Sequence, residues 1–153
     1  MLVIVGKAIP NKERGHVELF LHEFRNMLRS QGRFAYAWSF NPDRQATETI
    51  QKYLETDGVF IYLPDGRGGQ SRLRMHVIDF RHNPQCPVEW QSYCVKELLD
   101  QLKWGANRRI WFLIDKIDED LDPPVDLLNT FIPVFPHKYK KWGQNHFAFL
   151  RDK

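Results

Sequence analysis

Basic side chains gather at two places in the sequence, and each group has aromatic residues nearby. The first group surrounds a Gly-rich segment near residue 66, and the second directly precedes Trp142. Guanidinium and ammonium groups bind phosphates, while neighbouring rings offer faces on which unpaired bases stack. The pattern predicts contacts to a nucleic-acid backbone, with ordinary surface charge as the alternative explanation. The predicted phosphate-contacting residues are Arg67, Arg72, Arg74, Lys140 and Lys141.

A second group with binding chemistry, Trp38-Ser39-Phe40-Asn41, lies where a predicted strand ends before a predicted helix. Ends of strands often border ligand pockets, and this segment combines aromatic rings with hydrogen-bonding side chains. Ser39 and Asn41 carry donors and acceptors that a deep core would have to satisfy. We therefore expect Trp38 to form a pocket wall rather than to belong to the core.

Established catalytic and metal-binding motifs are absent from the sequence. The segment Gly66-Arg67-Gly68-Gly69 lacks the Gly-Lys-Ser/Thr of a phosphate loop, and no Gly-x-Ser-x-Gly occurs. Cys86 and Cys94 do not form a Cys-x-x-Cys pair, and we expect them to be reduced thiols. The six histidines show no paired metal-ligand spacing such as His-Glu-x-x-His. We expect neither a metal nor a cofactor.

The composition fits one globular domain. The chain has 153 residues, of which 42% are hydrophobic and 14% aromatic, which is enough apolar surface for a full-sized core. The formal net charge of +3 permits contact with phosphates without demanding it. No apolar run reaches the length of a membrane span, so we expect a soluble, cytoplasmic protein with no membrane partner.

Hydrophobic periodicity changes repeatedly along the chain. Strand patterns occur at 2–5, 34–40, 58–63, 73–80, 109–117 and 142–150. Helical spacing occurs at 17–30, after Asp43 and at 93–102, and a short turn or helix is expected at 123–128. This order predicts an α+β fold, with a curved mixed sheet or partly closed β-barrel and flanking helices. A doubly wound parallel sheet is disfavoured because it needs a regular helix between all its strands.

Four segments resemble the PUA-like superfamily, and within it the EVE and YTH-type domains. They are Phe34–Asn41, Asp57–Tyr62, Asp122–Leu128 and Trp142–Phe147, so that the resemblance extends over residues 34–150. It implies one PUA-like, EVE-like domain over residues 1–153, in which residues 1–32 form a strand–helix extension at the N-terminus. The implied fold agrees with the α+β pattern of strands and helices.

Domains of this kind bind RNA or DNA, and EVE and YTH-type members hold a flipped or modified base in an aromatic cage. A methylated base is more apolar and more polarisable, so stacking between rings favours it, while polar groups at the base edge discriminate. The resemblance implies a site of aromatic walls and base-edge contacts, and no cofactor. The implied walls are Trp38, Phe40, Tyr62 and Trp142, and the implied base-edge contacts are Ser39, Asn41 and Asn145.

Two functions of other classes remain open. Some PUA-like proteins are enzymes, so a small nucleotide- or RNA-directed hydrolase or nuclease is one alternative, with His76, Asp79 and His146 as its first candidate residues. The other alternative is a structural or partner-binding protein that buries its aromatic surface in an oligomer. An open pocket with aromatic walls and no paired acid and base would favour binding over catalysis.

Overall fold

A computed structural model of the chain describes residues 1–6, 11–38, 40–65, 69–96, 109–142 and 147–153, with only the backbone described for 11–20. The first half contains β1 (Leu2–Val5), α1 (Asn11–Gln31), β2 (Phe34–Trp38), α2 (Arg44–Glu55), β3 (Val59–Pro64) and β4 (Gln70–His82). The second half contains the 3-10 helix η1 (Val88–Tyr93), β5 (Ile110–Asp118), β6 (Val125–Asp126), α5 (Leu127–Thr130), β7 (Phe131–Pro133) and β8 (Ala148–Asp152).

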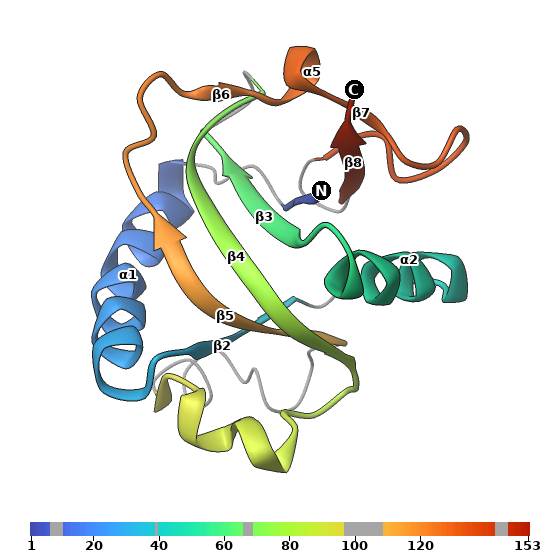
Figure 1. Cartoon of the computed structure of the whole chain (residues 1–153). Coiled ribbons are helices and arrows are strands. Elements are labelled where there is room, and N and C mark those ends of the chain that lie inside the picture. The colour runs from blue at the N-terminus through green and yellow to red at the C-terminus, as the bar shows by residue number, and fades with distance from the viewer. Residues whose placement is uncertain (7–10, 39, 66–68, 97–108, 143–146) are drawn as a thin grey trace.

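The strands form one curved mixed sheet in the order β2-β5-β4-β3-β1-β8-β7, with β6 paired to β4 (Figure 1). Strands β1 and β3 run parallel, and the other described pairs are antiparallel. The sheet is open, since the described ladder ends at β2 on one side and at β7 on the other. The prediction of an α+β fold with a mixed sheet is confirmed, while a closed barrel is not formed.

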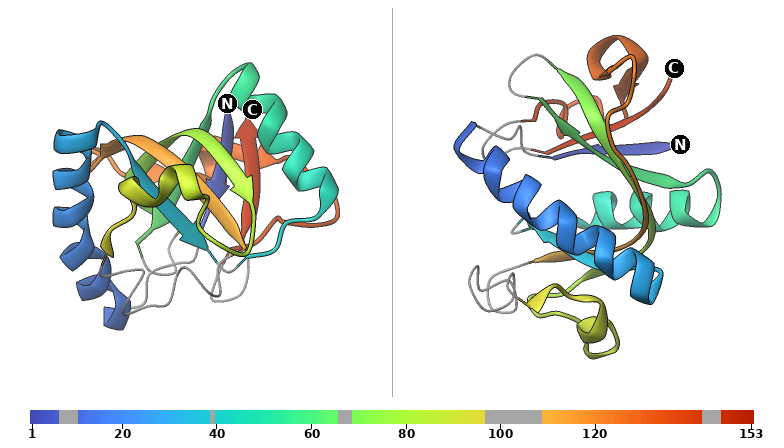
Figure 2. Two further views of the ribbon diagram at one scale, coloured as in Figure 1. Left: turned by 90° about the horizontal axis from the view of Figure 1, so that it is seen from below. Right: turned by 90° about the vertical axis from the view of Figure 1, so that its left-hand side faces the viewer.

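Strand β1 lies inside the sheet, between β3 and β8. All four of its side chains are buried, as expected for an uninterrupted Leu-Val-Ile-Val run. The two chain ends lie side by side (Figure 2), and the Met1 amino group is 3.0 Å from Asp152 Oδ2. Strand β1 is therefore an integral part of the sheet.

The end of helix α1 and the start of helix α2 each coincide with a residue type that favours a helix boundary. Helix α1 ends before Gly32, whose φ of 78° lies in the left-handed region that glycine adopts readily. Helix α2 begins after Asp43, whose side chain accepts a hydrogen bond from the Ala46 amide at 2.8 Å. Such a cap satisfies one of the four amides that a helix start leaves unpaired. Both predicted helices are confirmed.

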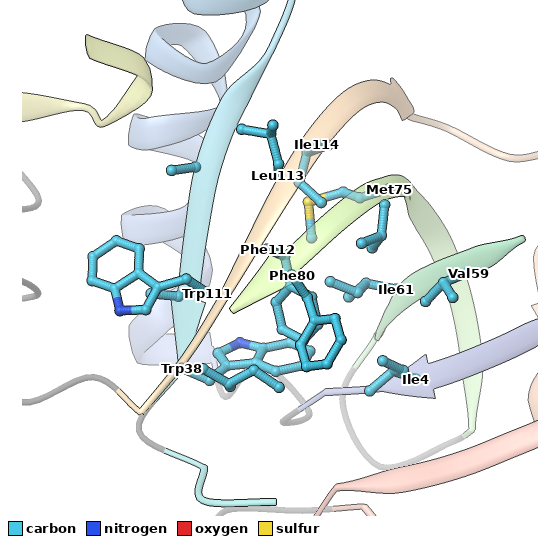
Figure 3. Close-up of a cluster of buried hydrophobic side chains, with 14 of the residues drawn as sticks. Ile4, Trp38, Val59, Ile61, Met75, Phe80, Trp111, Phe112, Leu113 and Ile114 are labelled. Carbon is cyan, nitrogen blue, oxygen red and sulfur yellow. The ribbon is translucent and has the colours of Figure 1, made fainter. Parts of the chain in front are cut away.

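Two hydrophobic cores lie on opposite faces of the sheet, because alternate side chains of a strand point to opposite sides. In β1, Leu2 and Ile4 belong to the larger core, whereas Val3 and Val5 belong to the smaller. The larger core also receives buried side chains from α1 and α2. Figure 3 shows part of it, with the Trp38 indole beside the rings of Phe80 and Phe112.

The predicted strands are confirmed with adjusted limits, and β3 and β4 pair as an antiparallel hairpin. Strand β7 was not predicted, because its three residues carry no periodicity to detect and it pairs with the distant β8. The predicted closing strand 142–150 is shorter in the structure, and residues 143–146 lie outside the described part. Most of the helix predicted at 93–102 also lies outside it, and η1 occupies Val88–Tyr93 instead.

Candidate nucleic-acid interface

A pocket of about 300 Å³ opens where the segment after β2 meets the segment between β7 and β8. Phe40 follows β2, Phe147 directly precedes β8, and residues 137–141 belong to the connection that leaves β7. The lining is half aromatic and half basic in character. It consists of Phe40, His137, Lys138, Tyr139, Lys140, Lys141 and Phe147.

Three rings form the apolar wall of this pocket. The ring centroid of Phe40 lies 4.6 Å from that of Phe147 and 5.6 Å from that of Tyr139. Phe147 in turn contacts Trp38 at 4.6 Å, which joins the wall to the larger core. Because the rings already contact one another, a base would stack on their exposed faces rather than enter between two of them.

The backbone around Tyr139 fixes the orientation of the basic segment. Tyr139 has a φ of 52°, a left-handed conformation that is uncommon for a residue with a large side chain. Its carbonyl accepts the Phe149 amide at 2.9 Å, its ring lies 5.0 Å from that of Phe149, and its hydroxyl accepts the Asp43 amide. These contacts hold the turn to both β8 and the start of α2, so the pocket is positioned by the sheet.

The three lysines of the pocket differ in their partners. Lys138 Nζ lies 2.6 Å from Asp43 Oδ2 and above the rings of Phe135 and Tyr139. Its hydrogen bond, followed by that of the Ala46 amide, holds the pKa of Asp43 below its ordinary value. Lys140 and Lys141 are exposed, and neither has an ion-pair partner among the described residues. They are therefore available to an anionic ligand.

The predicted aromatic walls do not come together. Trp38 is only 8% exposed and lies in the larger core behind Phe147, so the prediction that it forms an open wall is wrong. Gly6 makes this burial possible, because a Cβ there would lie 2.6 Å from the Trp38 indole. Tyr62 is 2% exposed in the smaller core, against which Trp142 also packs. Of the four predicted rings, Phe40 alone lines the pocket.

Of the three predicted base-edge contacts, one, Asn41, lies in the described part of the chain. Ser39 and Asn145 lie outside the described residues. Asn41 is exposed, and its Oδ1 accepts a hydrogen bond from His82 Nε2 at 2.6 Å. That bond uses one of the two lone pairs of the Asn41 carbonyl oxygen, so the oxygen can accept a second hydrogen bond and the amide nitrogen can donate to a base.

The predicted phosphate contacts also separate into two groups. Lys140 and Lys141 line the pocket, and Arg67 lies outside the described residues. Arg72 lies 3.7 Å from Asp65, and Arg74 pairs with Asp118 at 2.8 Å while donating to the Tyr62 hydroxyl. The two β4 arginines are thus engaged with carboxylates, and a phosphate would have to compete for them.

Two of the residues named for the hydrolase alternative, His76 and Asp79, pair with other residues and not with each other. His76 Nδ1 lies 2.6 Å from Asp115 Oδ1, whereas Asp79 pairs with Arg81 at 2.8 Å. His146 lies outside the described part. Among the described hydrogen bonds, none joins His76 to a Ser, Thr or Cys that could serve as a nucleophile. In the same part of the chain, no three His, Cys, Asp or Glu side chains are grouped to hold a metal ion.

Sequence reasoning missed His137, Lys138, Tyr139 and Phe147 as lining residues. The sequence did contain a signal for Lys138 and Tyr139. A ring lies within a run of cations in the segment Lys138-Tyr139-Lys140-Lys141. Phe147 offered no such signal, since only the fold brings it beside Phe40.

Comparisons of the chain with models of known families, with curated proteins and with solved structures give no match. In the described part of the chain, no helix has the length and apolar character needed to cross a membrane.

Proposed function

We propose that this protein binds single-stranded nucleic acid at the pocket between the segment that follows β2 and the segment that joins β7 to β8. The observation that carries the proposal is a wall of three rings beside two lysines without described carboxylate partners. Phe40, Tyr139 and Phe147 offer a stacking surface, and Lys140 and Lys141 are placed to contact the flanking phosphates. Stacking on one face is tolerant of sequence because every base has a π-face.

The size of the pocket supports one base as the bound unit. Its volume of about 300 Å³ lies at the lower end of the range of roughly 300–1,000 Å³ typical of ligand pockets. A modified or flipped base is the refined form of the proposal, since an added methyl group enlarges the area that stacks on Phe40 and Phe147. Oligonucleotides that differ only by base methylation would separate the general form from the refined one.

We also propose that the fold is PUA-like. Supporting this, the segment Phe34–Asn41 that resembles the aromatic strand of such domains reaches the pocket through Phe40. The segment Asp57–Tyr62 contributes β3, which pairs with β1 at the centre of the sheet. If the resemblance identifies the site, the bound base contacts Phe40 and not the β4 arginines. The Phe40 variant described in the Discussion tests that placement.

Binding to a labelled single-stranded oligonucleotide is expected to weaken steeply with salt. With two lysines on phosphates, log Kd should rise with log salt with a slope of about 1.4, or about sevenfold between roughly 50 and 200 mM salt. The double variant Lys140→Gln/Lys141→Gln should lose most of this slope, because it lacks the two ammonium groups that displace counterions from the phosphates. Fluorescence anisotropy across a salt series measures both quantities.

The matched control is Arg151→Gln/Lys153→Gln, which removes two exposed cations near the far end of β8. It changes the net charge equally and should leave the slope as it is. A wild-type protein that binds no oligonucleotide at low salt, or binds with a salt-independent affinity, would contradict the proposal. Equal losses in both double variants would show that general charge, not the pocket, attracts the ligand.

Asp43 competes with phosphate for Lys138, so Asp43→Asn is expected to tighten binding. Asparagine caps a helix as well as aspartate does, so α2 should keep its start while Lys138 loses its carboxylate partner. The salt slope should increase by about 0.7, the contribution of one further phosphate contact on a single strand.

Asp126→Asn is the control for this change, because Asp126 also caps a helix, accepting from the Asn129 amide at the start of α5. It removes the same charge away from the pocket and should leave the slope unchanged. If Asp43→Asn binds no better than Asp126→Asn, Lys138 does not reach the ligand.

A further inference from the structure

Two thiols lie in contact at the ends of η1. Cys86 Sγ is 3.1 Å from Cys94 Sγ, and the two share a hydrogen bond. Both are free cysteines, Cys86 partly exposed and Cys94 buried. A disulfide needs the sulfur atoms at about 2.05 Å, so bond formation requires an approach of about 1 Å.

The segment between the two cysteines is held in place by its own contacts. The Trp90 amide donates to the Pro87 carbonyl at 2.9 Å, and the Cys94 amide donates to the Gln91 carbonyl at 3.2 Å. Trp90 is buried and lies beneath the Arg81 guanidinium at 5.0 Å. The contact between the sulfur atoms therefore joins two ends of an ordered turn rather than two loose chain segments.

The two thiols differ in proton affinity. The hydrogen bond from Cys94 lowers the pKa of Cys86 below its ordinary value, with burial opposing it. The same hydrogen bond and burial raise the pKa of Cys94, so this thiol keeps its proton. Thiolates, not thiols, are the nucleophiles in sulfur chemistry. Cys86 is thus the more reactive sulfur and also the more accessible one.

We propose that Cys86 and Cys94 form a peroxide-sensitive dithiol, in which Cys86 is oxidised first and Cys94 completes an intramolecular disulfide. The Cys86 thiolate attacks one oxygen of a hydroperoxide, the O–O bond breaks, and the leaving oxygen takes up a proton as water or an alcohol. Cys86 is then a sulfenic acid. Oxidation consumes the Cys86 thiolate, whose hydrogen bond and charge had raised the pKa of Cys94. Cys94 then passes its proton to the departing hydroxyl group as its sulfur attacks Cys86 sulfur, so the S–O bond breaks and water leaves. Two thiols are oxidised and one peroxide is reduced.

Wild-type protein treated with hydrogen peroxide tests this directly. Both cysteines fall in one tryptic peptide, residues 82–96, since trypsin cleaves after Arg81 and Lys96. Peroxide should lower the mass of this peptide by two hydrogen atoms and remove both sites of alkylation, and dithiothreitol should restore them. No disulfide-linked dimer should form, because the bond joins two sulfur atoms of one chain.

Two variants test the order of the steps. In Cys94→Ser, Cys86 should stop at the sulfenic acid, which dimedone traps. In Cys86→Ser, the buried Cys94 should react at least about tenfold more slowly with peroxide. Equal rates in the two variants would overturn the assignment of roles. Wild-type thiols that survive peroxide, or that form disulfides only between chains, would overturn the proposal even if neither variant folds.

Discussion

Replacing Trp38 by alanine is expected to lower the free energy of unfolding by about 3–5 kcal/mol, as is usual for a buried tryptophan. The indole contacts Phe112 at 5.3 Å and Phe147 at 4.6 Å, and it fills the space beside Gly6. Its removal leaves a cavity under the pocket wall. Since domains of this kind have a total stability of about 5–15 kcal/mol, urea and thermal denaturation will detect the loss readily.

Trp142→Ala is the comparison, because Trp142 is only partly buried and packs at the margin of the smaller core. Its loss of stability should be clearly smaller than that of Trp38→Ala. Trp38→Phe should retain most of the stability, since a ring still contacts Phe147. A Trp38→Ala protein that melts like the wild type would show that the indole is not a core residue.

Replacing Phe40 by alanine is expected to weaken binding of a single-stranded oligonucleotide by about 5- to 150-fold. This corresponds to the roughly 1–3 kcal/mol that one stacked base contributes. Phe40 is only partly buried and faces the pocket, so its truncation removes stacking surface at less cost to the core than the loss of Trp38. The measurement is a titration followed by anisotropy at low salt, at a temperature where the variant is folded.

Phe60→Ala provides a matched control for this substitution. Phe60 is also partly buried, and it lies beside His76 at 4.9 Å and packs against the smaller core. The same atoms are removed, so a similar loss of stability is expected without a loss of binding. Equal affinities of the two variants would place the ligand away from the pocket. If Phe60→Ala alone bound the oligonucleotide more weakly, the ligand would instead lie near the β4 arginines.

The strands were predictable from the sequence because their apolar runs are buried. Ile110–Ile114 is buried throughout, and Gly58 and Gly32 mark boundaries by a positive φ that few other residues adopt. Which strands pair with one another was harder to predict from the sequence. The parallel pairing of β1 with β3 depends on contacts between distant segments, and no local pattern specifies it.

The candidate site was predicted only in part, for a similar reason. Lys140 and Lys141 were found because charges cluster locally, and Phe40 because it follows a strand end. Trp38 was misplaced because the space for it is provided by Gly6, a residue of another strand end. Whether a ring faces solvent or core depends on what lies opposite, which composition and spacing do not specify.

Placing β1 between β3 and β8 has a consequence for how the chain folds. The ladder pairs Ile4 with Phe149, so one edge of β1 finds its partner only after a large loop has closed. Such topologies have high contact order and fold slowly, because the entropy of loop closure is lost before the contacts are gained. Until β8 docks, the Leu-Val-Ile-Val run presents an unpaired apolar edge, the kind of surface that leads to aggregation. Truncation before β8 would leave that edge permanently open.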